Sequence, residues 1–321
     1  MEKENISDGV ADPVRQPATA ERIISMKKTI RIIGAPMDLG QSRRGVDMGP
    51  AAIRYANLSS QLRKLGYQVE DAGNIDISLR DALPEAGISS LLTAVRRACE
   101  LLYEAGREAV TDGCTPLFLG GDHSISIGTI GGITHYSPAG VIWIDAHGDF
   151  NIPEVSPSGN IHGMPVAVLT GSGFPELLNI GRAGPKLKPS EIVLMGIRRL
   201  DFRERSMLRE SGITVYTMRD IDERGMSTVA YEALEKLQHL PRIHVSLDAD
   251  SLDPIEAPGV GTPAPGGLTY REAHLLMEIL SDSSRIGSMD VVEINPILDQ
   301  RNQTAKIAVE LATSLLGDGI L

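Results

Sequence analysis

The sequence predicts an α/β fold of three layers, in which helices cover both faces of a mostly parallel sheet. Short apolar runs rich in β-branched residues recur along the chain, and helix-like stretches separate them. The runs are almost continuously hydrophobic, which is typical of strands buried on both faces. Strands of this kind that alternate with helices belong to one sheet with helices on its faces.

Each predicted strand is a nearly uninterrupted apolar run followed by a turn. The runs are Thr29–Ala35, Pro116–Leu119, Val141–Ile144, Ile192–Gly196, Ile213–Tyr216, Ile243–Leu247 and Ser288–Val292. In open α/β sheets, ligands bind beyond the carboxyl ends of the strands. We therefore expect the functional residues just after these runs.

Each predicted helix has apolar residues at helical spacing or a helix start signal. The segments are Ala51–Leu65, Leu91–Thr111, Ser227–Leu240, Tyr270–Leu280 and Gln303–Leu316. Thr269 directly precedes the fourth segment and is a candidate N-cap, since a threonine hydroxyl can accept a backbone N–H of the first turn.

The composition is that of a globular protein with one domain. Of the 321 residues, 42% are hydrophobic and 23% are charged. No repeat, low-complexity block or linker divides the chain, so we expect a flexible tail at 1–27 and a single domain at 28–321. The tail contains five acids and no continuous apolar core. These features argue against a secretory signal or a mitochondrial presequence.

Charge and cysteine content restrict the partners and the compartment. The formal net charge of −11 argues against nucleic acid or an anionic membrane as a partner. No apolar run approaches the ~20 residues that span a bilayer. Cys99 and Cys114 fit no zinc or redox motif, so we expect reduced thiols in a cytoplasmic protein, with Cys99 packed on a helix.

Three of the predicted strands lead into clusters of acids and histidines. Residues 120–126 read GGDHSIS, residues 145–151 read DAHGDFN and residues 246–254 read SLDADSLDP. In an extended segment, residues i and i+2 face the same side, so the acids and histidines within each motif could aim at one point. The side chains expected to converge are His123, Asp145, His147, Asp149, Asp248 and Asp250.

Such a cluster at the end of a buried sheet predicts a metal centre. Unpaired groups of this kind would be costly there without a compensating cation. Four carboxylates match the charge of two divalent ions, and two imidazoles without a thiolate suit Mn, Fe or Zn. One DxH or DxD pattern is more often a turn, a cap or a salt bridge, but three motifs on three strand ends favour a metal site. Of the histidines outside the motifs (His135, His239, His244 and His274), only His244 precedes an acid pair on its strand.

These motifs resemble those of the ureohydrolase superfamily, and those of bacterial arginases most closely. Segments 30–56 and 293–317 match as well, so the resemblance covers about nine-tenths of the chain. It implies an arginase/deacetylase-type fold with a central eight-stranded parallel sheet, two Mn(II) ions per subunit, and a homotrimer or homohexamer. The implied reaction is the hydrolysis of L-arginine to L-ornithine and urea by a hydroxide that the two ions share.

The resemblance also implies a role for each residue of the site. Asp145 and Asp248 would bridge the ions, His123 and Asp149 would complete one position, and His147 and Asp250 the other. Asp149 would also accept the proton of the hydroxide and pass it to the leaving amine. His162 would be a proton shuttle, and Glu293 would bind the guanidinium, for which a carboxylate that accepts N–H bonds is suited.

Five further positions match the residues with which arginases recognise the amino-acid end of the substrate. Asn151, Ser158 and Asn160 match those that contact the α-carboxylate, Asp201 matches the acid that faces the α-amine, and Thr262 lines the same pocket. Neutral donors suit a carboxylate, and an acid suits an ammonium.

The sequence departs from the arginase pattern at three places. Ser251 stands where glycine is usual, Ala264-Pro265 replaces an aliphatic pair, and residues 198–201 read RRLD. Another ureohydrolase activity, such as that of agmatinases, guanidinobutyrases or formiminoglutamases, therefore stays an alternative. A two-metal amide or phosphoester hydrolase would need basic residues in the motifs, which contain none. An inactive metal-stabilised scaffold would be expected to have lost ligands, and all six are present.

Overall fold

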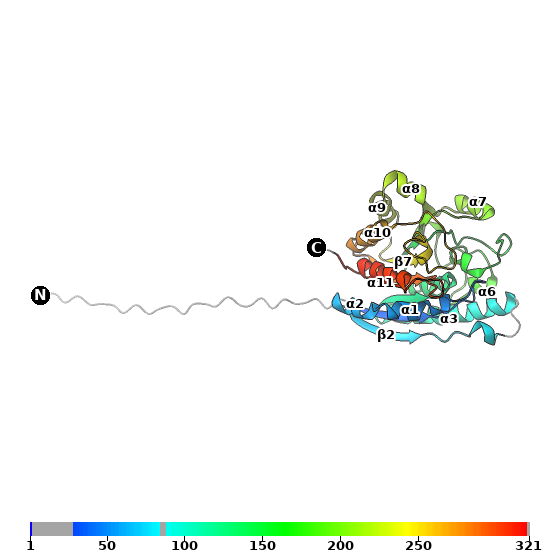
Figure 1. Ribbon diagram of the computed structural model, residues 1–321, viewed down its shortest axis with the longest axis horizontal. Helices are drawn as coiled ribbons and strands as arrows, with labels where there is room; N and C mark the ends of the chain where they lie inside the picture. The colour runs from blue at the N-terminus through cyan, green and yellow to red at the C-terminus, as the bar shows by residue number, and fades with distance from the viewer. Residues whose placement is uncertain (2–27, 84–87, 320–321) are drawn as a thin grey trace.

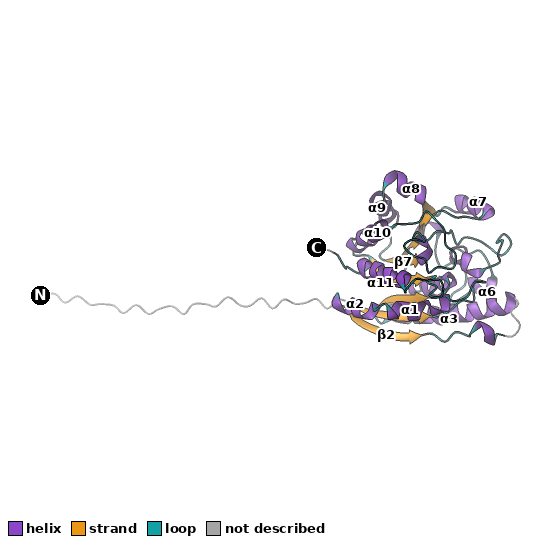
Figure 2. Cartoon of the chain, viewed as in Figure 1, coloured by secondary structure: helices purple, strands orange, loops and turns teal. Residues whose placement is uncertain are grey.

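The computed structural model describes residues 1, 28–83 and 88–319. Figure 1 shows helices packed around a central sheet, and Figure 2 separates the two kinds of element by colour. The tail predicted at 1–27 lies outside the described residues, except for its first residue. Within the described part, no helix combines the length and the apolar character needed to cross a bilayer.

The sheet has eight strands in the order β2-β1-β3-β8-β7-β4-β5-β6. Every neighbouring pair is parallel. The strands are β1 Thr29–Ala35, β2 Gln68–Asn74, β3 Thr115–Gly120, β4 Gly140–Ile144, β5 Ile192–Ile197, β6 Thr214–Thr217, β7 Ile243–Asp248 and β8 Ile286–Val292. The predicted parallel α/β sheet is confirmed.

Helices cover both faces of the sheet. They are α1 Gly49–Tyr55, α2 Leu58–Lys64, α3 Ile88–Thr111, α4 Ser126–Ile133, α5 Pro165–Leu169, α6 Pro175–Leu178, α7 Phe202–Ser211, α8 Met218–Arg224, α9 Met226–Lys236, α10 Tyr270–Asp282 and α11 Gln303–Leu315. Short 3-10 helices are η1 Val46–Met48, η2 Arg80–Ala82, η3 His123–Ile125, η4 Ile161–Gly163, η5 Pro189–Glu191 and η6 Ala249–Ser251. One buried apolar cluster joins the sheet to α1, α2 and α8–α11, and two further clusters join its other face to α3–α7.

Three predictions about individual elements need correction. The edge strand β2 was not expected, because its sequence QVEDAGN is polar and nearly all of it is exposed. The helix predicted at Ala51–Leu65 is two helices, since Asn57 between them has a left-handed φ of 67°. The helix predicted at Ser227–Leu240 ends at Lys236.

The order of the strands places the predicted motifs side by side. The GGDH, DAHGD and DAD motifs follow β3, β4 and β7, and Glu293 follows β8. These four strands are adjacent at the centre of the sheet and all run in the same direction. Their carboxyl ends therefore meet at one edge, where the strand order reverses, as expected for a ligand site in an open α/β sheet.

Candidate metal centre

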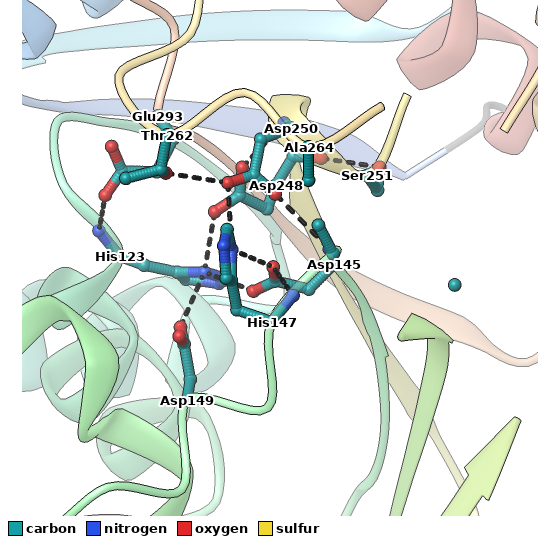
Figure 3. A network of polar contacts seen from close by, with 12 residues as sticks. His123, Asp145, His147, Asp149, Asp248, Asp250, Ser251, Thr262, Ala264 and Glu293 are labelled. Carbon is teal, nitrogen blue, oxygen red and sulfur yellow. Dashed lines mark hydrogen bonds and ion pairs between the residues drawn. The ribbon is translucent and has the colours of Figure 1, made fainter. Parts of the chain in front are cut away.

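Capped 3-10 turns position His123 and Asp250 at this edge of the sheet. Asp122 caps η3 by accepting the Ser124 N–H, and so starts the turn that carries His123. Asp248 ends β7 and caps η6 in the same way, with the Asp250 N–H donating to its Oδ1 at 2.7 Å. Figure 3 shows the two histidines and four aspartates pointing toward one another.

The ring of His123 marks one candidate cation position. Its Nδ1 lies 3.2 Å from Asp145 Oδ2, 3.1 Å from Asp149 Oδ2 and 3.1 Å from Asp248 Oδ2. All four side chains are buried, yet this nitrogen has no hydrogen-bond partner among the described residues. A buried polar atom without a partner calls for an explanation, and a cation among one imidazole and three carboxylate oxygens provides it.

The ring of His147 marks a second position. Its Nδ1 lies 3.1 Å from Asp250 Oδ2 and 3.5 Å from Asp145 Oδ1. Asp145 therefore presents one oxygen to each histidine, an arrangement that suits a ligand shared by both positions. The two groups with metal-binding geometry, His123/Asp145/Asp149 and Asp145/His147/Asp250, share this residue. Asp248 faces the first position through its Oδ2, and its Oδ1 accepts the Asp250 N–H.

Neighbouring groups fix the orientation of the ligands. The indole of Trp143 stacks on the imidazole of His123, with ring centroids 4.0 Å apart and planes at 13°. The same indole donates its N–H to Asp145 Oδ2 at 3.0 Å. The second ring nitrogen of His123 lies 2.9 Å from Ser246 Oγ. Partners behind the ligands hold the metal-binding atoms in place.

The ligands converge for a different reason from the one expected. Asp145, His147 and Asp149 do not lie on an extended strand, because β4 ends at Ile144 and Asp149 has a φ of 48°. Asp250 lies in η6. The six predicted residues do meet, but through turns rather than through strand alternation. A left-handed φ at a non-glycine residue costs about 1–3 kcal/mol, and such residues cluster at functional sites.

The surplus of buried acids disturbs proton binding in the centre. Burial and the charges of Asp250 and Asp145 raise the pKa of Asp248 well above its usual range. Burial and the charge of Asp145 raise the pKa of Asp149 to about 6. Burial would lower the pKa of His147, but the nearby Asp250 and Asp145 raise it to about 12. Cations in the centre would take the place of these shared protons.

Glu293 and His162 form a pair beside the first position. His162 Nδ1 and the His123 N–H each lie 2.9 Å from Glu293 Oε1, and Gln41 donates its side-chain amide to Oε2 at 2.8 Å. Glu293 is buried and has a φ of 61°. Burial would lower the pKa of His162, but the Glu293 carboxylate raises it to about 9.

A cavity of about 330 Å³ opens from the centre to the surface. All five predicted recognition residues line it, together with His147, Asp149, His162, Asp248 and Asp250. Glu293 contacts the lining residue His162 but is not itself among the lining residues described. Asn151 donates to Asp201 at 3.1 Å and Thr262 donates to Asp250 at 2.9 Å. The lining residues that sequence reasoning missed are Ser156, Gly163, Arg199 and Glu204.

Ser251, which departs from the arginase pattern, and Arg198, which keeps it, both have a structural role. Ser251 has no positive φ that would require glycine, and its hydroxyl donates to the Asp248 carbonyl at 2.6 Å. Arg198 of the RRLD segment donates to the carbonyls of Gly196, Asp250, Ser251, Leu252 and Ala264. Both residues brace the loop after β7. The fold and the centre together define an α/β protein whose clustered histidines and aspartates are positioned to bind metal ions.

The model of the arginase family matches residues 28–317, and the chain belongs to this family. An arginase from Bacillus caldovelox is 53% identical over 298 residues, which are 92% of this chain and 100% of that protein. An arginase from Bacillus subtilis (strain 168) is 52% identical over 297 residues, again 92% and 100% of the two chains.

Solved structures give the same relationship. The native structure of the Bacillus caldovelox arginase at pH 5.6 has a TM-score of 0.89 at 52% identity, and covers 92% of this chain and 100% of its own. An Entamoeba histolytica arginase in complex with L-ornithine has a TM-score of 0.83 at 30% identity, with 90% and 98% covered. The expected arginase-type fold is confirmed.

Proposed function

We propose that this protein hydrolyses L-arginine to L-ornithine and urea. The observation that carries the proposal is the meeting of two histidines and four aspartates at the floor of a cavity whose walls suit a cationic amino acid. Membership of the arginase family, and two curated bacterial arginases at 53% and 52% identity, support the same reaction. The chain is a hydrolase that acts on a C–N bond of a linear amidine.

Two Mn(II) ions per subunit are the proposed cofactor. His123 and Asp149 would complete one position, His147 and Asp250 the other, and Asp145 with Asp248 would bridge them. The donor set is rich in oxygen, has two imidazoles and contains no thiolate, which suits Mn(II). Two such ions supply a nucleophile at neutral pH by lowering the pKa of a shared water.

The protein's own side chains would orient the guanidinium and move the protons. Glu293 is the proposed anchor, because its carboxylate adjoins the cavity-lining His162 and a carboxylate can accept N–H bonds from a planar cation. Asp149 would accept the proton of the nucleophile and pass it toward the leaving amine. His162 lines the cavity and contacts Glu293, so it would exchange protons between solvent and the reacting groups.

Recognition of the amino-acid end is assigned to the outer wall of the cavity. Asn151, Ser158 and Asn160 provide neutral polar groups for the α-carboxylate, and Asp201 provides a charge for the α-amine. Thr262 lines the same cavity and is held against Asp250. A site built around polar groups discriminates strongly against analogues that lack the matching group.

Urea release from L-arginine and from agmatine tests the proposal. Agmatine has the guanidinium but lacks the α-carboxylate, so the Mn(II)-loaded protein should hydrolyse L-arginine with the higher kcat/KM. Asn160→Ala should reduce kcat/KM for L-arginine more than for agmatine. Faster hydrolysis of agmatine, of 4-guanidinobutyrate or of formiminoglutamate by the unmodified protein would assign it to another ureohydrolase activity.

We also propose a cytoplasmic homotrimer or homohexamer that acts in arginine catabolism, with L-arginine as its small-molecule partner. Both cysteines are free thiols, as is usual in a reducing compartment. Phe202, Ile255 and Ile297 are highly exposed apolar side chains, which a subunit contact could cover. Sedimentation velocity would distinguish a monomer from the proposed assemblies.

A further inference from the structure

A buried polar network lies beneath the metal centre, on the face of the sheet that α4 covers. It starts at the ligand His123 and ends at Asp290 and His244, which lie deeper in the sheet on β8 and β7. Asp290 and Ser246 are register partners on these two strands. None of the members is more than 3% exposed. Most interior positions of such a sheet are apolar, so a carboxylate here requires a reason.

The contacts form a continuous chain from the carboxylate to the metal ligand. The Ser126 hydroxyl donates to Asp290 Oδ2 at 2.7 Å. Ser126 Oγ lies 3.4 Å from Ser246 Oγ, and Ser246 Oγ lies 2.9 Å from His123 Nε2. Asp290 Oδ2 also accepts the Thr129 hydroxyl at 2.9 Å and lies 3.3 Å from His244 Nε2.

The hydrogen bonds that Asp290 accepts give this chain a direction. The Ser126 hydroxyl donates its one hydrogen to Asp290. Toward Ser246 it can therefore act only as an acceptor. When the Ser246 hydroxyl donates to Ser126, it has no hydrogen left for His123 and accepts from the Nε2–H. With its hydrogen on Nε2, a neutral His123 has a free lone pair on Nδ1. That is the nitrogen that faces the three carboxylate oxygens.

We infer that Asp290 is a positioning residue, which acts through Ser126 and Ser246 to hold His123 in the tautomer that binds a metal ion at Nδ1. The inference rests on the proposed function only in taking His123 as a metal ligand. This role explains why a carboxylate is buried in the interior of the sheet. It also predicts that one ion position depends on this network and the other does not, because His147 has no contact with it among the described residues.

Asp290→Asn tests the direction of the chain. A neutral amide of the same shape accepts more weakly, and its NH₂ group can donate to Ser126 and so reverse the chain. Ser246→Ala tests the chain itself, since it leaves the Nε2–H without an acceptor. Ser288→Ala is the matched control. It removes a buried hydroxyl that contacts His244 Nδ1 at 2.9 Å but lies outside the path to His123.

The measurement is a titration of metal-free protein with Mn(II), in which the electron paramagnetic resonance of free Mn(II) gives the two dissociation constants. Asp290→Asn and Ser246→Ala should each raise the dissociation constant of one ion by about 10–100-fold. This is the usual effect of losing a hydrogen-bond partner of a metal ligand. The second ion should bind as in the unmodified protein, and Ser288→Ala should change neither. If Asp290→Asn does not fold, Ser126→Ala breaks the same chain without removing the charge.

Two results would overturn the inference while the proposed function stands. Both constants could stay unchanged in Asp290→Asn and Ser246→Ala. Alternatively, both constants could weaken equally together with a lower melting temperature of the metal-free protein, which would indicate a merely structural role. An unmodified protein that binds no divalent ion would overturn the proposed function and the inference together.

Discussion

Asp149 occupies a position that suits two roles. Its left-handed φ of 48° turns the side chain toward His123, with Oδ2 at 3.1 Å from Nδ1, while the residue also lines the cavity. A strained conformation persists only where the surrounding structure fixes it. The carboxylate can therefore hold an ion on one side and meet the substrate on the other.

Replacement of Asp149 by asparagine should abolish turnover and leave the fold intact. The amide has the same shape but can neither balance a cation nor accept the proton, and loss of a general base alone costs about 10²–10⁴ in rate. Urea release and circular dichroism melting of the metal-free protein measure the two effects. Glu210→Gln, at an exposed position of α7, is the control. Near-normal activity of Asp149→Asn would contradict the assignment.

Gln41 should matter for catalysis although no motif contains it. It is buried and donates to Glu293 Oε2 at 2.8 Å, so Gln41→Leu removes one of the donors that fix the guanidinium anchor. We expect kcat/KM for L-arginine to fall about tenfold, the value of one hydrogen bond to a charged group. Gln41→Glu places a second carboxylate beside that of Glu293, so kcat/KM should fall further than in Gln41→Leu. A Gln41→Glu variant as active as Gln41→Leu would contradict this arrangement.

The stability of the start of α7 should depend on pH. Glu204 accepts the N–H groups of Asp201 and Phe150, and so joins this helix to the loop of the metal motif. Burial raises the pKa of Glu204 to about 7, from an ordinary value of 4.5. At a pH between these two pKa values, Glu204 is protonated more fully in the folded protein than in the unfolded chain. The contribution of Glu204 to stability is therefore complete below the ordinary pKa and is lost as the pH rises through the folded pKa.

The pH dependence of unfolding in Glu204→Gln isolates this effect. The unfolding free energy of the unmodified protein minus that of the variant should fall by about 1–3 kcal/mol between about pH 5 and 8. Urea denaturation at a fixed Mn(II) concentration gives both values. Glu210→Gln on the same helix should show no such trend. A difference that stays constant or rises with pH would contradict the assigned cause.

The sequence predicts those elements whose burial produces a hydrophobic run or an amphipathic spacing of residues. The runs later seen as β1 and β3–β5 are nearly continuous in hydrophobicity because both of their faces are covered. The runs of β7 and β8 are buried as well but carry polar residues among the apolar ones. Edge strand β2 has no such run. Helix α4, SIGTIGGI, is buried on every side and rich in glycine, so it lacks the amphipathic pattern of α3. Its glycines admit close contact with α3, where a Cβ on Gly128 would lie 2.3 Å from the Cys99 carbonyl oxygen.

The site was predictable in its residues and not in its geometry. Two histidines and four acids could be named from three motifs, because parallel strands bring their carboxyl ends together. The turns that aim Asp149 and Asp250 could not be inferred, since they depend on a positive φ and a 3-10 helix. Gln41, Arg199 and Glu204 were not singled out, because none lies in the three motifs and each reaches the site through tertiary contacts.

The molecule as a whole concentrates negative charge at one buried edge of its sheet. Folding without cations must bring together four aspartates, and burial raises the pKa of Asp149 and Asp248 there. Ions that bind only the folded state stabilise it, by about 2.7 kcal/mol for one site at one hundred times its dissociation constant. Metal content should therefore control the stability of the entire domain.

Removal of metal should lower the melting temperature, and Mn(II) should restore it. For a chain of this size, about 2.7 kcal/mol corresponds to a shift of several degrees. Differential scanning fluorimetry after chelation, with and without added Mn(II), measures the change. Ca(II) at the same concentration should restore less, because it prefers oxygen ligands alone. Equal melting temperatures with and without Mn(II) would be inconsistent with a filled centre.

Anomalous diffraction from crystals grown with Mn(II) tests the central claim most directly. We predict two manganese peaks per subunit at the carboxyl ends of β3, β4 and β7, one beside His123 and the other beside His147, with Asp145 between them. Histidine and aspartate side chains that point apart, with no anomalous density among them, would contradict the account.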